Sequence, residues 1–281
     1  MRARRLMSWL PLLPVLAATA VLAAETRPVT VKGSDTMVIM GQRWAEAYMK
    51  GHPEAKIQVT GGGSGTGIAA LLNGTTDICN ASRPMKAGER KQFQAKYGSE
   101  VVETPVAMDG IAVYVHASNA VPSLTVAQLK DIYTGHVRDW KEVGGSPGAI
   151  LLYGRENNSG TYEFFKEHIL GGKDFAEETQ TMPGTASVIN AVTKDPMGIG
   201  YGGAAYAKGV RKVPVRKDAA SEPIEVSKDT VQNRTYPINR FLYCYTAQGL
   251  REDGKAYLTW MLTDEGQKVV EAVGYFPLPK K

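Results

Sequence analysis

The sequence predicts an α/β protein of two lobes, each a mostly parallel sheet flanked by helices, joined by two crossover strands. Strand-like and helix-like segments alternate along both halves of the chain. Two long apolar stretches of extended character, at 101–116 and 236–245, separate these halves and would cross between the lobes. Because the last helix then returns to the first half, we expect a discontinuous first lobe, 25–107 plus 241–281, and a second lobe at 108–240.

The first lobe begins with a βαβαβ pattern. Apolar and polar residues alternate in the short strands, while Met40, Trp44 and Tyr48 recur at helical spacing in the first connecting segment. The expected elements are strands at 29–34, 56–61 and 77–82 and helices at 37–50, 65–73 and about 86–97. Strands joined through helices run parallel, with the helices covering the faces of their sheet.

The second lobe repeats this alternation with less regular spacing. The expected elements are helices at 125–134, 160–170 and about 185–194 and strands at 150–155, 198–202 and 211–216. A final helix at 254–273 carries apolar residues at helical intervals, Leu258, Met261 and Leu262 among them. This helix would complete the first lobe.

The first 24 residues are typical of a secretory signal peptide. Residues 1–5 contain three arginines, an apolar stretch follows, and a small pair precedes a charged residue, so cleavage is expected after Ala23 or Ala24. An N-terminal membrane anchor is the alternative. It is disfavoured because the apolar stretch is short of the ~20 residues that a span needs and contains two prolines. We therefore expect an exported protein in a bacterial periplasm.

Composition and charge exclude several function classes. The chain is 43% hydrophobic and 22% charged, which excludes wholesale disorder and a polytopic membrane protein. The net charge of +5 includes three arginines and no acid in residues 1–24, so the rest carries 30 basic and 28 acidic side chains, or +2. A nearly neutral chain without a basic run predicts no nucleic-acid partner.

Histidine and cysteine positions predict no metal site and leave a disulfide open. The four histidines are scattered, without the spacing to one another, to cysteines or to acids that metal ligands show. Cys79 and Cys244 both lie in apolar, strand-like runs. Sequence alone does not place their Cα atoms within bridging distance, and two separately buried thiols are the favoured interpretation.

Three turns, each following a predicted strand and opening a predicted helix, share one chemistry. They are GSDTM at 33–37, GGGSGTG at 61–67 and RENNSGT at 155–161. Helix N-termini favour an anion because they expose unpaired N–H groups and the positive end of the helix dipole. Hydroxyls add donors, glycines allow close backbone approach, and Arg155 adds a charged fork suited to a tetrahedral oxyanion. All three turns would lie beyond the carboxyl ends of strands, where open α/β sheets bind ligands.

Each turn also has a purely structural interpretation. Ser34 and Thr36 could be helix N-caps, and the glycine-rich stretch could be a plain turn. Arg155 could be a surface ion-pair residue. The coincidence of three hydroxyl-rich turns, one of them with an arginine, favours an anion site over three separate explanations.

The chain resembles the phosphate-binding receptors of bacterial ABC-type phosphate importers, which are two-lobed periplasmic binding proteins of the type II class. The resemblance covers essentially the whole chain after residue 24 and rests on the three turns, on DICNASRP at 77–84 and on GIGYGG at 198–203. It implies a monomeric, non-catalytic receptor for inorganic phosphate without cofactor or metal. It also implies a membrane permease as partner, with the ATPase on separate chains, because this chain has no G-x-x-x-x-G-K-[ST] motif.

The resemblance and the three turns together indicate a set of ligand-binding residues. They are Ser34, Asp35, Thr36, Met37, Ser64, Gly65, Thr66, Arg83, Arg155, Ser159, Gly160 and Thr161. The most specific part of the match is Arg155 with the Ser-Gly-Thr that follows it. Thr36 and Met37 are expected to act mainly through backbone groups.

One departure from the family concerns the choice between phosphate and sulfate. Well-known members carry an acidic residue after the strand-end serine, where it accepts the proton of hydrogen phosphate, but here Arg83 follows Ser82. Arg83 would either turn away or join Arg155 as a second cation, and we hypothesise that it forms an ion pair beside the ligand. Asp35 would then be the proton acceptor, with Asp109 as a weaker candidate and a helix-capping role as the alternative for Asp35.

Two other functions stay open at this point. The chain could be a receptor for another tetrahedral oxyanion of the sulfate class. It could also be a secreted phosphoester hydrolase, which would need a nucleophile with a base, or a metal, beside Arg155. The sequence shows no such cluster, so a hydrolase is the less favoured of the two.

Overall fold

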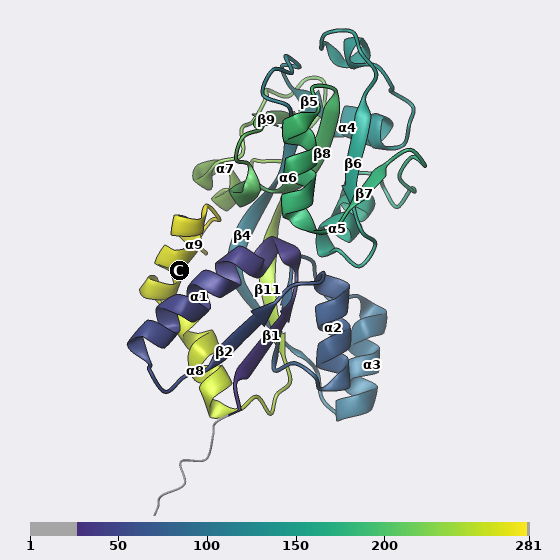
Figure 1. Ribbon diagram of the computed structural model, residues 1–281. Helices are drawn as coiled ribbons and strands as arrows, with labels where there is room; N and C mark the ends of the chain where they lie inside the picture. The colour runs from purple at the N-terminus through teal and green to yellow at the C-terminus, as the bar shows by residue number, and fades with distance from the viewer. Residues whose placement is uncertain (1–26, 280–281) are drawn as a thin grey trace, which may run out of the picture.

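The computed structural model describes residues 27–279, so the signal peptide predicted at 1–24 lies outside the described residues. One sheet runs through both lobes in the strand order β2-β1-β3-β11-β4-β8-β6-β7, with β9 also paired to β4. Figure 1 shows the two ends of this sheet wrapped by separate groups of helices. The protein is therefore an α/β protein with a mostly parallel sheet flanked by helices, as the sequence predicts.

The first lobe is built on three parallel strands and five helices. The strands are β1 (Val29–Gly33), β2 (Ile57–Thr60) and β3 (Ile78–Ala81), and the helices are α1 (Val38–Gly51), α2 (Ser64–Asn73), α3 (Ala87–Tyr97), α8 (Glu252–Met261) and α9 (Asp264–Val273). A short 3₁₀ helix, Asp35–Met37, precedes α1. Val31 of β1 and Trp44 of α1 belong to one apolar core, which fixes α1 against the sheet.

The second lobe combines a parallel pair of longer strands with short strands and four helices. The strands are β5 (Leu124–Thr125), β6 (Leu151–Arg155), β7 (Gln180–Met182), β8 (Gly198–Gly203), β9 (Arg211–Val213) and β10 (Val215–Arg216), and the helices are α4 (Val126–Tyr133), α5 (Gly160–His168), α6 (Gly184–Lys194) and α7 (Lys228–Gln232). The rings of Phe165 and Tyr201 stack with centroids 4.0 Å apart, and Tyr133 packs edge-on at 5.1 Å from Phe165. These aromatic contacts hold α4 and α5 against β8.

Two long strands, β4 (Val102–Val115) and β11 (Asn239–Thr246), pair antiparallel and cross between the lobes, as Figure 1 shows. On β4, Ala107 belongs to the first apolar core and Met108 to the second. The chain returns to the first lobe along β11, between Ile238, which belongs to the second core, and Leu242, which belongs to the first. We propose on this ground that the lobes divide at these crossings, between residues 107 and 108 and near residue 240.

Three differences from the predicted elements have local causes. The strand predicted at 211–216 is divided at Pro214, whose nitrogen carries no hydrogen to donate to a sheet ladder. The helix predicted at 254–273 is two helices, because Thr263 caps the second by accepting from the N–H of Gly266. Strand β7 and helix α7, three and five residues long, are too short to produce a periodic pattern in the sequence.

The two cysteines are free, buried, and on opposite faces of the sheet. Cys79 of β3 pairs with Tyr245 of β11, and Cys244 pairs with Asn80, the next residue of β3. Because successive residues of a strand face opposite sides, the two thiols point away from each other. They accordingly belong to different apolar clusters.

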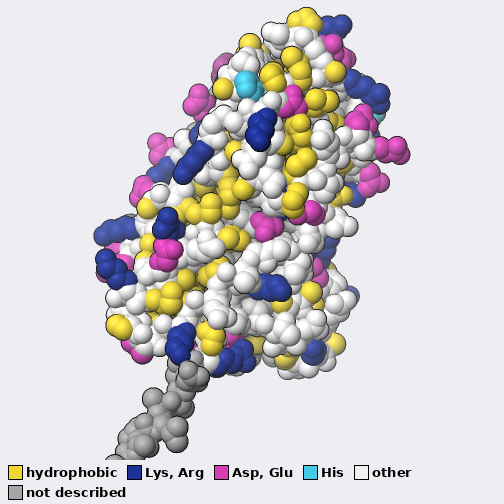
Figure 2. All heavy atoms as spheres, in the orientation of Figure 1, with side chains coloured by type: hydrophobic (Ala, Val, Ile, Leu, Met, Phe, Trp, Pro, Cys, Tyr) yellow, Lys and Arg dark blue, Asp and Glu magenta, His cyan; other side chains and the backbone are white. Residues whose placement is uncertain are grey.

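Charged side chains of both signs are mixed over the face in Figure 2, on both lobes and without a broad area of one sign. Within residues 27–279, no helix is long and apolar enough to cross a bilayer. The same residues contain no group of three or more His, Cys, Asp or Glu side chains that could hold a metal ion.

Candidate functional site

The three hydroxyl-rich turns meet where the two lobes face each other. They follow β1, β2 and β6, and together with the end of β3 they gather hydroxyl side chains that are each at most 3% exposed. These residues, which we call the hydroxyl cluster, are Ser34, Thr36, Ser64, Ser82, Ser159 and Thr161. Buried hydroxyls are costly unless they have polar partners, so a cluster of this density marks a site for hydrogen bonding.

Hydrogen bonds within the hydroxyl cluster join the two lobes. The Ser34 hydroxyl donates to Ser82 Oγ at 2.9 Å, and the N–H of Ser82 donates to Ser64 Oγ at 3.0 Å. Across the lobes, Thr36 Oγ1 and Thr161 Oγ1 lie 2.9 Å apart. A hydroxyl hydrogen rotates to suit its surroundings, so each of these groups can also donate to an acceptor placed among them.

The start of helix α5 brings the second lobe's share of the cluster into contact with the first lobe. The Ser159 hydroxyl caps α5, accepting from the N–H groups of Thr161 at 3.2 Å and Tyr162 at 3.3 Å. A Cβ atom on Gly160 would lie 2.3 Å from Ser64 Oγ. Glycine at this position therefore allows α5 to approach the first lobe, and Ser159 has a structural role besides any contact with a ligand.

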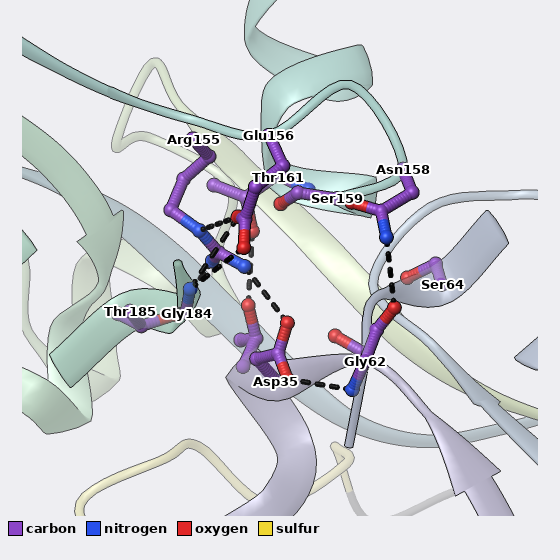
Figure 3. Close-up of polar contacts among 12 residues, drawn as sticks. Asp35, Gly62, Ser64, Arg155, Glu156, Asn158, Ser159, Thr161, Gly184 and Thr185 are labelled. Carbon is purple, nitrogen blue, oxygen red and sulfur yellow. Dashed lines mark hydrogen bonds and ion pairs between the residues drawn. The ribbon is translucent and has the colours of Figure 1, made fainter. Parts of the chain in front are cut away.

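Arg155 is buried at the end of β6 with its guanidinium held at every nitrogen. Its Nη2 donates to Asp35 Oδ2 at 2.9 Å, Nη1 donates to Thr185 Oγ1 at 2.9 Å, and Nε donates to Glu156 Oε2 at 3.1 Å (Figure 3). Its side chain is 1% exposed. Two carboxylates are thus paired with one guanidinium, which fixes the orientation of the guanidinium and offsets its positive charge.

Asp35 links the first two turns of the first lobe to the second lobe. Its Oδ1 accepts from the N–H of Gly62 at 2.8 Å, while Oδ2 accepts from Arg155. Its backbone carbonyl accepts from the Tyr206 hydroxyl at 2.8 Å. Burial raises the pKa of Tyr206 to about 12, so this hydroxyl stays protonated and donates at neutral pH.

The backbone donors of the first-lobe turns have partners of their own. The Met37 side chain lies in the apolar core, and its N–H donates to the carbonyl of Ser34 at 2.9 Å. The N–H of Gly65 donates to the carbonyl of Asn158 at 2.9 Å, and Thr66 Oγ1 accepts from Asn158 Nδ2 at 3.3 Å. An anion bound to Met37 or Gly65 N–H groups would have to replace these bonds.

Arg83 makes a bidentate ion pair with Glu89 at the start of α3. Its Nη2 and Nη1 donate to Glu89 Oε1 and Oε2 at 2.7 and 2.8 Å, and Nη1 also donates to the Pro84 carbonyl. Burial opposes charge on both groups, but the pair outweighs it: the pKa of Arg83 is raised and that of Glu89 is lowered. The guanidinium of Arg83 is therefore paired within its own lobe. This is the arrangement expected if Arg83 turns away, and not the one expected if it joins Arg155 as a second cation.

A second guanidinium, that of Arg240, enters the hydroxyl cluster from the crossing strand β11. Its Nε and Nη2 donate to Asp109 Oδ2 at 3.1 and 2.8 Å, Nη1 donates to the Ser82 carbonyl at 2.8 Å, and Nη2 donates to Thr161 Oγ1 at 3.0 Å. Complete burial raises the pKa of Asp109, although Arg240 opposes that shift. Arg240 is not among the site residues that the sequence indicated. The signal available was the presence of charged residues inside the two apolar crossing stretches, Glu103 and Asp109 in the first and Arg240 in the second.

The chemistry of this arrangement is hydrogen-bond donation from hydroxyls and guanidiniums. Hydroxyls from both lobes lie beside two guanidiniums, and each guanidinium is balanced by carboxylate. In residues 27–279, the hydrogen bonds of these hydroxyls involve no histidine and no cysteine that could activate a nucleophile. Such a set of donors suits reversible binding of an oxyanion.

Comparison with known proteins identifies relatives over most of the chain. The family model described as the PBP superfamily domain matches residues 18–265. The phosphate-binding protein PstS of Pseudomonas aeruginosa is 35% identical over 266 residues, covering 89% of this chain and 82% of the relative. The phosphate-binding protein PstS of Staphylococcus epidermidis is 34% identical over 260 residues, covering 89% and 78%.

Solved structures show the same similarity. A putative phosphate ABC transporter substrate-binding protein from Clostridium perfringens, with bound phosphate, matches with a TM-score of 0.82 and 29% identity over 90% of this chain and 100% of that one. An ABC-type phosphate transport receptor from Vibrio cholerae matches with a TM-score of 0.71 and 25% identity over 89% and 100% of the two chains.

Proposed function

The chain belongs to the PBP superfamily and, within it, to the PstS phosphate-binding proteins, and from this membership we propose that it binds inorganic phosphate for an ABC-type importer. The observation that carries the proposal is the hydroxyl cluster, in which donors from two lobes converge beside Arg155 and Arg240. Tetrahedral oxyanions present acceptors in several directions, and donors from both sides can satisfy them together.

The ligand contacts in this proposal come from both lobes. The hydroxyls of Thr36 and Ser64 and the hydroxyl of Thr161 supply neutral donors, and Arg155 supplies the charge. Because these groups sit on opposite sides of the β4 and β11 crossings, phosphate would favour the closed arrangement by its contacts with both lobes. Ser34, Met37, Ser159 and Gly160 would shape this site through the turns they form.

Asp35 is the proposed acceptor for the proton of hydrogen phosphate. Its carboxylate lies at the site, between Arg155 and Gly62. Asp109 is less suited, because its side chain is completely buried against Arg240, whereas the Asp35 side chain is 21% exposed. A carboxylate facing the ligand rejects sulfate, which carries no proton at neutral pH, and so supports phosphate as the physiological ligand.

We also propose where the protein acts and which partner it serves. We expect a monomer, exported by the segment at 1–24, that releases phosphate to a membrane permease whose ATPase is on separate chains. The donors at the site bind a ligand without an activated nucleophile, so we propose a receptor and not an enzyme. A sulfate-class receptor is the second candidate, because Arg83 stands where the family's acid is expected.

Calorimetric titration of the chain without residues 1–24 tests this function. Phosphate, arsenate and sulfate are titrated in parallel into phosphate-free protein at neutral pH. We expect stoichiometric binding of phosphate and arsenate, and much weaker binding of sulfate. Tighter binding of sulfate than of phosphate would replace the proposal with the second candidate, and turnover of a phosphoester would contradict the non-catalytic role.

A further inference from the structure

Asn158 of the second-lobe turn 155–161 forms hydrogen bonds with the glycine-rich turn 61–67. Its backbone carbonyl accepts from the N–H of Gly65 at 2.9 Å. Its side-chain Nδ2 donates to the carbonyl of Gly62 at 3.0 Å and to Thr66 Oγ1 at 3.3 Å. Figure 3 shows Asn158 reaching down from the second lobe to the Gly62 carbonyl of the first.

The glycines of the first-lobe turn are shaped around this residue. A Cβ atom on Gly63 would lie 2.6 Å from the Asn158 carbonyl oxygen, closer than real side chains approach. Gly63 also has a φ of 88°, a conformation that other residues rarely adopt. A Cβ on Gly65 would lie 3.2 Å from the same oxygen. The glycines of this turn therefore allow the backbone of Asn158, from the second lobe, to pack against the first lobe. This role is separate from any contact of the turn with an anion.

The neighbouring asparagine provides a contrast within the same turn. Asn157 is also exposed, but no hydrogen bond or ion pair of its side chain is found among residues 27–279. Both asparagines are one or two residues from Ser159, and neither belongs to the hydroxyl cluster. The contacts of Asn158 with Gly62, Gly65 and Thr66 thus reflect its particular position and not a general property of the loop.

We propose that Asn158 is a latch that holds the two lobes closed and so sets the rate at which phosphate leaves. Its contacts join the lobes directly and exist only when the lobes are together. They therefore stabilise the closed state without contact between Asn158 and the ligand, which makes Asn158 a positioning residue. The part concerning phosphate release rests on the proposed function, whereas the effect on lobe closure does not.

The first test compares Asn158→Ala with Asn157→Ala. Protein loaded with ³²P-phosphate is mixed with excess unlabelled phosphate, and release is followed by filtration, with association and affinity measured separately. Loss of one or two hydrogen bonds of the latch should speed release about three- to tenfold, with association little changed. Asn157→Ala should release phosphate at the parent rate. Equal release rates in the two variants would overturn the latch.

The second test needs no ligand affinity. Spin labels attached at Lys91→Cys on α3 and Lys173→Cys in the second lobe report the distance between the lobes. The two native cysteines are fully buried, so the labelling reagent does not reach them. Asn158→Ala should shift the distances toward open lobes in the absence and presence of phosphate, and Asn157→Ala should not. Unchanged distances would overturn the latch. A parent protein that fails to bind phosphate while its distances respond to Asn158→Ala would contradict the proposed function alone.

A purely structural role for Asn158 would show itself differently. It would lower the melting temperature of the phosphate-free protein without affecting the release rate. That result would also overturn the proposal, because the latch acts on the closed state and not on the folding of either lobe.

Discussion

Asp35 of the first lobe and Arg155 of the second lie 2.9 Å apart, Oδ2 to Nη2, and each is also bonded within its own lobe. Asp35 accepts from Gly62, and Arg155 donates to Thr185 and Glu156. This ion pair therefore couples the position of the Arg155 guanidinium in the second lobe to the glycine-rich turn in the first lobe. Both members are testable by substitution.

Arg155→Ala should weaken phosphate binding by tens to thousands of fold while the fold stays intact. Loss of one partner of a buried charge pair typically costs ~2–5 kcal/mol of binding free energy. Calorimetry gives the affinity, and far-UV circular dichroism checks the fold. The matched control is Arg138→Ala, because Arg138 is 75% exposed and its partner Glu178 is 3.6 Å away. An unchanged dissociation constant in Arg155→Ala would remove Arg155 from the site.

Asp35→Asn should narrow the difference between phosphate and sulfate affinities. The amide keeps the shape of the carboxylate but is uncharged and offers one acceptor oxygen in place of two, so it opposes sulfate less than the carboxylate does. Parallel titrations with the two anions measure the ratio. If the variant excludes sulfate as strongly as the parent, the proton acceptor lies elsewhere in the protein.

Arg240→Leu should lower the free energy of unfolding by about 3–5 kcal/mol, because it leaves Asp109 as an unpaired buried charge. Adding Asp109→Asn removes that charge and keeps an acceptor for the N–H of Ala204, so the double variant should be more stable than the single one. Urea denaturation measures both. A double variant no more stable than Arg240→Leu would show that the lost contacts with Ser82 and Thr161 dominate.

Glu89→Gln should destabilise the protein at neutral pH and have less effect in acid. The pKa of Glu89 is lowered in the folded protein because the hydrogen bonds and charge of Arg83 outweigh burial. The stabilisation is therefore present above the ordinary glutamate pKa and is lost as the pH falls through the lowered, folded value. Hydrogen bonds to a charged group suggest a loss of about 1.5–3 kcal/mol at pH 7.

Denaturant unfolding at several pH values tests this dependence, with the exposed Glu100→Gln as control. The stabilities of Glu89→Gln and the parent should converge toward acid pH. A difference that stays constant with pH would mean that Glu89 contributes through packing and not through its charge.

The alternating elements and the Arg155 turn could be predicted because their signals are local. Alternation, helical spacing and strand-to-helix turns each lie within a few consecutive residues, and so does the run from Arg155 to Thr161. The short β7 and α7 and the helix break at Thr263 could not be predicted, since their patterns are too brief or depend on one cap.

The remaining site residues depend on contacts between distant segments. Arg240 is 131 residues from Asp109 and 79 from Thr161, and no pattern along the chain reports those distances. Asn158 is 92 residues from the Thr66 hydroxyl that it contacts. The pairing of Arg83 with Glu89 could have been predicted from the sequence. Glu89 is only six residues away and lies at the start of a predicted helix, where a carboxylate is favoured.

The place of β11 in the sheet dictates an order of assembly. It lies between β3 and β4, which are consecutive along the chain, so both of those strands have an unpaired edge until residues 239–246 have been synthesised. The core of the second lobe draws mostly on residues 108–238. During synthesis that lobe can therefore form while the first waits for the C-terminus.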